Sequence, residues 1–381
     1  MHFLIAPDSF KASLNASAVT DAIAVGLVDI VDDVTVVKRP MADGGEGTID
    51  AILASQSGRV ITTKVIGPLG GGQLLSASFG VMTIDQKKIA IVELAQSSGL
   101  GYIPQEKQNP LYTTTFGYGQ LIASALDQDI DKLILALGGS GTNDCGCGML
   151  QALGIQFKDG FGDDIVGEMT AALLSQVSSI DTTKLDHRLS KVEIEICCDV
   201  NNVLLGTQGA STVYGPQKGA STQIVMQLEQ NMNHIINIIE KKTERAVRDI
   251  SGSGAAGGVA AALLSFTHAT VVPGGALVMQ LCSLEDAIAK ADVVITGEGQ
   301  LDTTSKMGKI VSSIAVLAKK HKKPVIAIVG QNKATKQEIA EMGIAKVVSL
   351  VNDNVSIAQA QANPVQHIQA AISKIDFLQL I

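Results

Sequence analysis

Glycines and carboxylates gather in four short segments of the chain, a combination that can hold phosphate groups. The segments are Asp43-Gly44-Gly45-Glu46-Gly47, Gly138-Gly139-Ser140-Gly141-Thr142-Asn143-Asp144, Gly252-Ser253-Gly254-Ala255-Ala256-Gly257-Gly258 and Gly297-Glu298-Gly299. Glycine lets backbone N–H groups approach an anion closely, and the N-terminus of a following helix adds about half a positive charge. The tight packing of a turn explains any single cluster equally well. Four clusters in one chain favour a polyphosphate ligand.

Acidic side chains accompany two of these clusters. Asp43 and Glu46 belong to the first cluster, Glu298 belongs to the last, and Asp302 follows it closely. Carboxylate oxygens are the protein ligands that Mg²⁺ takes, while water and phosphate oxygens complete its shell. We therefore expect a magnesium ion to accompany the phosphates.

Three familiar catalytic patterns are absent or incomplete. The chain has no GxxxxGK[ST] segment, which excludes a P-loop. Residues 252–257 spell GxGxxG, but they follow a polar stretch, and no acidic residue stands about twenty residues further on. A nicotinamide-dependent dehydrogenase is therefore only a distant alternative. No GxSxG surrounds Ser9 or Ser140, and Cys145 and Cys147 are best interpreted as small residues that fill a tight turn.

The elements that position these residues alternate between strands and helices. Short aliphatic runs predict strands at residues 3–6, 34–37, 133–137, 192–197, 292–296, 325–329 and 346–350. Apolar residues at helical spacing predict helices, the clearest at about 222–241. This alternation predicts a mostly parallel sheet covered on both faces, which binds ligands at the carboxyl ends of its strands. Three of the four glycine clusters follow predicted strands.

Residues 58–94 interrupt the alternation. Runs at 60–65, 76–82 and 89–93 have the spacing of antiparallel hairpins, with three consecutive glycines between the first two. A length of 381 residues also exceeds that of most single cores. The sequence therefore predicts a discontinuous parallel α/β domain at residues 1–62 plus 286–381 and an inserted mixed α/β domain at residues 63–285.

Composition and charge exclude several classes of protein. The formal net charge is −8, the wrong sign for a surface that displaces counterions from nucleic acid. No apolar run approaches the roughly eighteen residues of a membrane span, and the first residues lack the pattern of a signal peptide. Five cysteines without zinc-finger spacing indicate reduced thiols. We expect a cytoplasmic protein without a membrane or nucleic-acid partner.

Several longer segments follow one another along the chain in a distinctive order. They are Ala6-Pro7-Asp8-Ser9-Phe10-Lys11, Pro40-Met41-Ala42-Asp43-Gly44-Gly45-Glu46-Gly47-Thr48, Gly138-Gly139-Ser140, Thr142-Asn143-Asp144, Tyr214-Gly215-Pro216-Gln217-Lys218-Gly219-Ala220, Gly254-Ala255-Ala256-Gly257-Gly258 and Thr296-Gly297-Glu298-Gly299 with Asp302. In this order and at these separations they resemble the bacterial type-1 glycerate kinase family, from the first predicted strand to about residue 309. Departures are small in volume; Cys145, for example, stands where glycine is expected.

The resemblance implies a kinase that uses ATP and Mg²⁺ to convert D-glycerate into a phosphoglycerate, usually the 2-phosphate, with 3-phosphoglycerate as the alternative product. It implies two α/β domains: a doubly wound, mostly parallel, flavodoxin-like sheet, interrupted by the inserted mixed α/β domain, with the active site in the cleft between them. A non-catalytic sensor of glycerate or nucleotide is a further alternative, because fold alone does not prove turnover. The oligomeric state is left open, with a homo-oligomer as one option.

The resemblance and the needs of phosphoryl transfer together suggest roles for the site residues. Asp43 is the expected base, Lys11 is expected to contact the transferring phosphoryl group or the glycerate carboxylate, and Asp8 is a third catalytic residue. The expected Mg²⁺ ligands are Glu298 and Asp302. The expected ATP contacts are Gly138, Gly139, Ser140, Asn143, Gly254, Gly257, Gly258 and Lys218. The expected glycerate contacts are Ser9, Arg39, Gly44, Gly45 and Glu46. A solvated or capping role is the alternative for each charged residue, and Asp8, Asp144 and Asp199 compete for the base and metal roles.

Overall fold

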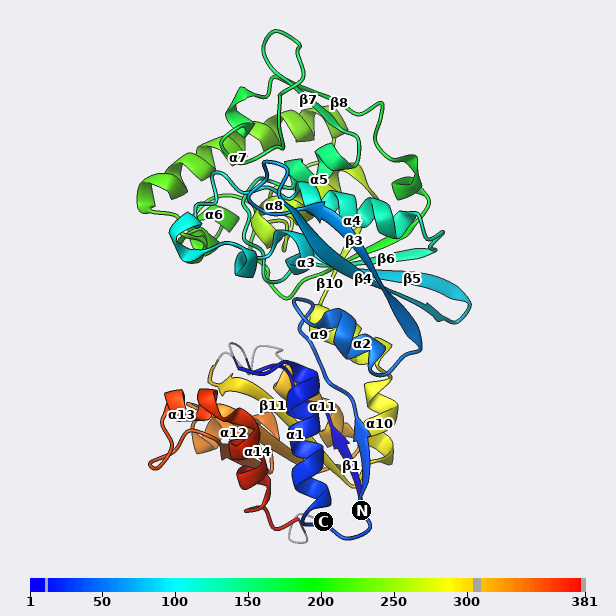
Figure 1. The fold of residues 1–381 in the computed structure, drawn as a ribbon, viewed down its shortest axis with the longest axis vertical. Coiled ribbons are helices and arrows are strands. Elements are labelled where there is room, and N and C mark those ends of the chain that lie inside the picture. The colour runs from blue at the N-terminus through cyan, green and yellow to red at the C-terminus, as the bar shows by residue number, and fades with distance from the viewer. Residues whose placement is uncertain (11–12, 304–309, 378–381) are drawn as a thin grey trace. The chain divides into compact units, whose positions relative to one another are not determined.

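The structure, a computed structural model, describes residues 1–10, 13–303 and 310–377 of the chain. Contacts within the chain define two compact units, shown in Figure 1. Unit 1 comprises Met1–Asp43, Asp50–Ser57 and Gly274–Ile381, and unit 2 comprises Gly44–Ile49 and Gly58–Pro273. Each unit contains its own sheet and its own hydrophobic core.

The sheet of unit 1 contains five parallel strands. They are β1 (His2–Ile5), β2 (Thr35–Lys38), β11 (Val293–Leu301), β12 (Val325–Asn332) and β13 (Lys346–Ser349). Their order across the sheet is β13-β12-β11-β1-β2, which is the 2-1-3-4-5 order of flavodoxin-like folds. This order confirms the predicted doubly wound parallel sheet. In such sheets, ligands bind beyond the carboxyl ends of the two strands at which the order reverses, here β1 and β11.

Helices cover both faces of this sheet. The helices of unit 1 are α1 (Ala16–Val28), α9 (Gly274–Leu281), α10 (Leu284–Lys290), α11 (Ile310–Lys320), α12 (Lys336–Met342), α13 (Ile357–Ala362) and α14 (Pro364–Ile372). Phe3 and Ile5 of β1 share a core cluster with Ile23 of α1 and Ile372 of α14, and these two helices lie side by side in Figure 1. Leu4, the alternate strand residue, points to the opposite face, where α10 and α11 contact β1 and β11.

The sheet of unit 2 is mixed. Its strands are β3 (Gly58–Ile66), β4 (Leu74–Ile84), β5 (Lys87–Glu93), β6 (Lys132–Ala136), β9 (Glu193–Cys197) and β10 (Thr270–Val272), in the order β10-β9-β6-β5-β4-β3. The pairs β3–β4 and β4–β5 are antiparallel, which confirms the predicted hairpins, and the other neighbours are parallel. Gly70, Gly71 and Gly72 in the first hairpin connection all have positive φ, a conformation that glycine adopts readily.

The helices of unit 2 include one long amphipathic helix, as the sequence predicted. They are α3 (Ala95–Ser98), α4 (Phe116–Leu126), α5 (Cys147–Ala152), α6 (Ala210–Tyr214), α7 (Thr222–Thr243) and α8 (Ala255–Phe266); α2 (Thr48–Leu53) crosses the division between the units. A small two-stranded sheet consists of β7 (Gln156–Lys158) and β8 (Ser179–Asp181). Ser221 caps the N-terminus of α7, because its hydroxyl accepts from the Ile224 N–H, and the helix buries a stripe that includes Leu228 and Ile235.

One predicted boundary is wrong. The sequence placed Gly297-Glu298-Gly299 in a turn after a strand that ends at residue 296, but β11 continues through this segment to Leu301. Gly297 pairs with Ile328 of β12, and a Cβ on Gly297 would lie 2.1 Å from the Ile328 carbonyl oxygen. The glycines therefore allow two strands to approach closely, and Glu298 lies within a strand.

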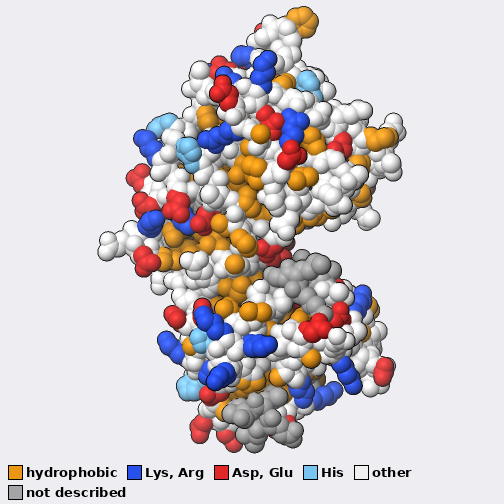
Figure 2. Space-filling model, turned by 180° about the vertical axis from the view of Figure 1, so that it is seen from behind, with side chains coloured by type: hydrophobic (Ala, Val, Ile, Leu, Met, Phe, Trp, Pro, Cys, Tyr) orange, Lys and Arg blue, Asp and Glu red, His pale blue; other side chains and the backbone are white. Residues whose placement is uncertain are grey.

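Two further observations concern the surface and the helices. On the face shown in Figure 2, Lys and Arg side chains are interspersed with Asp and Glu side chains. Within the described part of the chain, every helix is too short or too polar to span a membrane.

Candidate active site

The reversal point of the unit 1 sheet brings three predicted site residues together. Asp8 and Ser9 follow β1, and the Asp8 N–H donates to the Gly297 carbonyl of β11 over 2.8 Å. The Ser9 N–H donates to Asp8 Oδ1 over 2.6 Å, which fixes that carboxylate above the end of β1. Glu298 is the next residue of β11 and is 9% exposed. A flavodoxin-like order thus places two carboxylates and a hydroxyl where such sheets bind ligands.

Glu298 lies within β11, and Asp302 directly follows the last residue of that strand. Glu298, Gln300 and Asp302 occupy alternate positions, which places them on one face, and Gln300 Nε2 donates to Asp302 Oδ2 over 2.7 Å. Among the described residues, no group of three or more His, Cys, Asp or Glu side chains could enclose a metal ion. Each of these two carboxylates is an oxygen ligand of the kind that nucleotide-bound Mg²⁺ takes beside waters and phosphate oxygens.

Arg39 is held by backbone carbonyl groups of unit 1. Its Nε donates to the Cys282 carbonyl over 3.2 Å, and its Nη1 donates to the Lys38 carbonyl over 2.9 Å. Lys11, the expected contact for the transferring phosphoryl group, lies outside the described residues. These two hydrogen bonds use two of the five N–H donors of the guanidinium, so the predicted role of Arg39 as a glycerate contact is compatible with them.

The Gly44-Gly45 turn packs against the turn that follows β6. A Cβ on Gly138 would lie 2.5 Å from Gly45 Cα, so the two glycine segments touch through their backbones. Thr48 Oγ1 donates to the Gly45 carbonyl over 2.8 Å, which closes the turn before α2. Asp43 directly precedes this turn, and Glu46 is exposed. The structure thus brings two of the four predicted clusters into direct contact within unit 2.

Glu93 is a buried carboxylate that sequence reasoning did not single out. It is the last residue of β5, is 1% exposed, and its Oε1 accepts from the Ile49 N–H over 2.7 Å. Its position at the carboxyl end of a parallel strand, after an apolar run, is the signal that could have identified it. Glu93 anchors the segment that carries Gly44 and Gly45.

The turn after β6 carries a network of buried polar groups. Ser140 Oγ lies 3.3 Å from Thr142 Oγ1, and Asn143 Nδ2 donates to Ser211 Oγ of α6 over 3.0 Å. Asn143, Thr142 and Ser211 have no exposed surface, and Lys218 is 3% exposed. Ser211 gives no signal in the sequence, because its contact with Asn143 joins residues 68 positions apart.

Lys218 inserts its ammonium into this turn. Its Nζ donates to the Thr142 carbonyl over 2.7 Å and to Ser140 Oγ over 3.2 Å. Burial lowers the pKa of Lys218 to about 8, and the charge of Asp144 only partly opposes that effect. The predicted contacts Ser140, Asn143 and Lys218 are therefore brought together, and the ammonium among them is desolvated.

Asp144 is a buried carboxylate that accepts hydrogen bonds from three residues. Its Oδ2 accepts from the N–H and the hydroxyl of Thr115 over 2.8 and 2.7 Å and from the Gly148 N–H over 3.2 Å, while Oδ1 accepts from the Gly146 N–H over 3.1 Å. Burial raises the pKa of Asp144, and these four donors oppose that rise. The carboxylate joins the start of α4 to the start of α5 and so fixes the turn that holds Asn143.

The segment Gly254–Gly258 packs tightly against the same turn. Ala256, Gly257 and Gly258 all have positive φ at the start of α8. A Cβ on Gly257 would lie 2.3 Å from the Thr142 carbonyl oxygen, and one on Gly254 would lie 2.3 Å from the Val203 carbonyl oxygen. Close backbone packing therefore explains these glycines, and the same packing sets the position of Thr142. The segment follows α7 and a turn, not a strand, so the residues do not form a dinucleotide-binding fingerprint.

The two cysteines of this region are buried thiols. Cys145 has a φ of 53°, which agrees with the expectation of glycine at this position, and Cys147 begins α5. Burial raises the pKa of both thiols, so neither provides a thiolate nucleophile near neutral pH. Packing accounts for both side chains.

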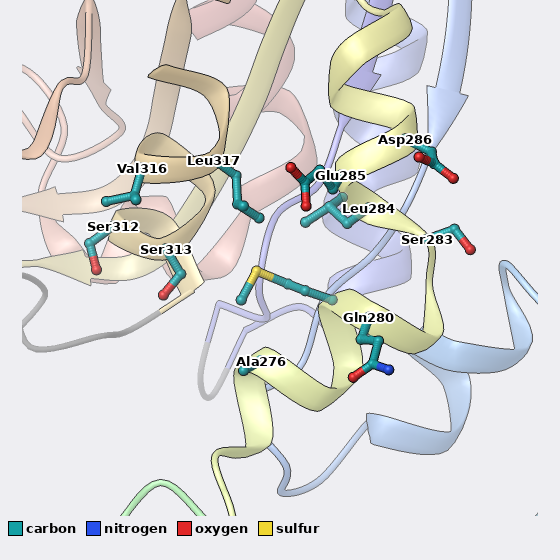
Figure 3. Close-up of a pocket in the computed structure, with 11 residues that line it drawn as sticks. Ala276, Gln280, Ser283, Leu284, Glu285, Asp286, Ser312, Ser313, Val316 and Leu317 are labelled. Carbon is teal, nitrogen blue, oxygen red and sulfur yellow. The ribbon is translucent and has the colours of Figure 1, made fainter. Parts of the chain in front are cut away.

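A separate pocket in unit 1 lies between α9, α10 and α11. Its volume is about 660 Å³, and Figure 3 shows that Ala276 and Gln280 come from α9, Leu284 from α10, and Val316 from α11. Ser283, Glu285, Asp286, Ser312 and Ser313 add polar groups to its lining. None of the sequence-predicted site residues lines this pocket.

The chain is similar to proteins of one family over nearly its whole length. The model of the glycerate kinase family matches residues 3–379. The glycerate kinase of Haemophilus influenzae is 44% identical over 352 residues, 92% of each chain, and the glycerate 2-kinase of Escherichia coli is 41% identical over 92% of this chain and 91% of its own. The crystal structure of a Salmonella typhimurium LT2 protein assigned as glycerate kinase 2 has a TM-score of 0.84 and 38% identity, and the match covers 100% of this chain and 98% of that one. The protein is an ATP-dependent kinase, and the chain belongs to the glycerate kinase family.

Proposed function

We propose that the protein transfers the γ-phosphoryl group of ATP to D-glycerate and releases 2-phosphoglycerate. One observation carries this proposal: the predicted motif residues lie at the carboxyl ends of parallel strands in each unit, after β1 and in β11 in unit 1 and after β6 in unit 2. Relatives named glycerate kinase that match more than nine-tenths of the chain support the acceptor, and the Escherichia coli relative, a glycerate 2-kinase, supports the 2-phosphate. The motif series favours the type-1 branch of the family.

The reaction is a displacement at phosphorus. A hydroxyl oxygen of glycerate forms a bond to the γ-phosphorus, the bond from that phosphorus to the bridging oxygen breaks, and ADP leaves with the electron pair. The hydroxyl proton passes to a base, for which we propose Asp43. Such a transfer is accelerated mainly by positioning and by stabilising charge, so few residues need to react covalently.

We propose the remaining roles as follows. Glu298 and Asp302 would hold Mg²⁺, which neutralises charge on the phosphate oxygens when it is bound. Asp8 and Ser9, at the reversal point of the unit 1 sheet, would position the reacting groups together with Lys11. Ser140, Asn143 and Lys218 would contact ATP, with Gly138 and Gly139 allowing its phosphates to approach the backbone closely. Arg39 and the Gly44-Gly45-Glu46 segment would contact glycerate.

Phosphorus NMR of the product tests both the activity and the position of transfer. The purified protein is incubated with ATP, Mg²⁺ and D-glycerate, and the proton-coupled spectrum is recorded. A 2-phosphate couples to one proton on its carbon and gives a doublet, whereas a 3-phosphate couples to two protons and gives a triplet. A new doublet supports the proposal, a triplet assigns the alternative product, and the absence of any new phosphomonoester rejects the proposed function.

A further inference from the structure

Lys218 is a buried cation whose hydrogen-bond partners are neutral. The side chain is 3% exposed, and Nζ donates to one carbonyl and one hydroxyl. Within the described ranges, no carboxylate oxygen lies within 4.0 Å of this nitrogen. An ammonium has three donors, so these two partners leave one N–H available. A buried charge without an opposite charge in contact with it is unfavourable, and the charge of Asp144 offsets the burial of Lys218 only in part.

The Asn143 side chain carries a second polar group without a partner. Asn143 directly follows Thr142, whose carbonyl accepts from Lys218. Its side chain is fully buried, Nδ2 donates to Ser211 Oγ, and no described group donates to Oδ1. If the amide nitrogen and oxygen are exchanged, the serine hydroxyl can donate to the oxygen and the NH₂ group is left without an acceptor. Either orientation leaves a buried polar atom of Asn143 without a partner.

We propose that Lys218 and Asn143 form an oxyanion site, in which an anionic oxygen of the substrates pairs with the Lys218 ammonium and a neighbouring polar atom of the same ligand satisfies Asn143. The proposal rests on the proposed function for its ligands. The site requires an oxyanion that lies close to a hydroxyl or to a second oxygen of the same ligand. Two groups of the substrates meet this requirement: the carboxylate of the hydroxy acid and a phosphate of the nucleotide.

The surrounding packing favours a preformed site over a flexible surface contact. Asp144 accepts four hydrogen bonds that fix the turn, and the backbone of Gly257 presses against Thr142. The Thr142 carbonyl is thereby held in place on one side by α8 and on the other by Lys218. If Lys218 served only to hydrogen-bond a carbonyl and a hydroxyl, a neutral donor would be sufficient. A neutral donor would form the same hydrogen bonds without the cost of desolvating an ammonium.

A ligand titration of the wild-type protein tests the site. Lysine side chains are labelled with ¹³C and ¹⁵N, the Lys218 signal is assigned with Lys218→Arg, and its pKa is measured alone and with saturating D-glycerate, inorganic phosphate or ADP. The occupant is expected to raise the pKa of Lys218, because an anion stabilises the ammonium. A rise with D-glycerate alone assigns the carboxylate, and a rise with phosphate or ADP assigns a phosphate. An unchanged pKa with all three ligands overturns the proposal.

Calorimetry with variants gives an independent measurement. Lys218→Met is expected to weaken binding of the assigned ligand at least about 30-fold, because one partner of a buried charge pair is lost. Lys241→Met, which removes an exposed lysine of α7, is the matched control and should bind like the wild type. Wild-type affinity of Lys218→Met for all three ligands overturns the proposal. The two proposals can fail separately. If the wild-type protein has no kinase activity but phosphate still raises the pKa of Lys218, the proposed function is rejected and the oxyanion site is retained.

Discussion

Replacing Lys218 by methionine should make the unliganded protein more stable at neutral pH. Burial lowers the pKa of this lysine from 10.5 to about 8, and a shift of that size corresponds to about 3 kcal/mol at roughly 1.4 kcal/mol per pKa unit. Below pH 8, the lysine is protonated in both the folded and the unfolded chain, and the whole penalty is present. Methionine removes the charge but leaves the Ser140 hydroxyl and the Thr142 carbonyl without this donor, which costs about 1–3 kcal/mol.

The dependence on pH separates these two effects. Between pH 8 and 10.5 the unfolded chain binds more protons at this lysine than the folded chain does, so wild-type stability should rise with pH relative to that of Lys218→Met. The advantage of the variant should therefore shrink by about 3 kcal/mol between pH 7 and pH 10.5. Urea unfolding followed by circular dichroism at several pH values measures this change. Lys241→Met should follow the wild-type profile, and a stability difference for Lys218→Met that is constant across this range would refute the reasoning.

Four further predictions concern the site and its packing. Asp43→Asn should lower kcat about 10²- to 10⁴-fold while glycerate binding stays largely intact, and a near-normal kcat in the folded variant would defeat the assignment of Asp43 as the base. Asp144→Ala should destabilise the protein by at least about 3 kcal/mol, measured by urea unfolding, because it removes an acceptor of four buried hydrogen bonds; a small loss would contradict its structural role. Gly257→Ala should destabilise the protein more than Gly162→Ala does, because both have positive φ but only the former places a Cβ 2.3 Å from the Thr142 carbonyl oxygen; equal melting temperatures would refute this packing argument. Excess chelator should abolish turnover and added Mg²⁺ should restore it, and full activity in chelator would exclude the metal from the reaction.

Much of the fold could be predicted from the sequence because its strands carry strong local signals. The aliphatic run at 325–329 lies within β12, and the hairpin spacing of 58–94 matches β3, β4 and β5. Strand β10 has only three residues and depends on pairing with β9, so no local sequence pattern predicts it. The extension of β11 was missed because glycines usually indicate turns, and only the partner strand shows why glycine suits a strand here.

The candidate site was predictable in its residue types but not in its electrostatics. The glycine turn after β6 follows from the strand that precedes it, and the Lys218 segment was identified through family resemblance. In the sequence, Lys218 stands between glycine and proline residues and has the character of an exposed turn. Its burial results from packing against a turn 76 residues away, a distance over which local patterns carry no information.

Two buried charged groups at the same turn, those of Asp144 and Lys218, differ in their hydrogen-bond partners. This difference indicates where a ligand is needed. Asp144 is buried, but four donors surround its carboxylate and compensate part of the cost of burying its charge. Lys218 is equally buried, yet it contacts only neutral acceptors, and its pKa falls accordingly. If the turn served stability alone, a neutral residue at position 218 would be the more favourable choice, as replacements of buried ionic groups by apolar ones often show. A lysine charge that destabilises the unliganded protein is understandable when a bound anion compensates it. Pairing the ammonium with the anion removes the cost of the buried charge, and this gain contributes to the free energy of ligand binding.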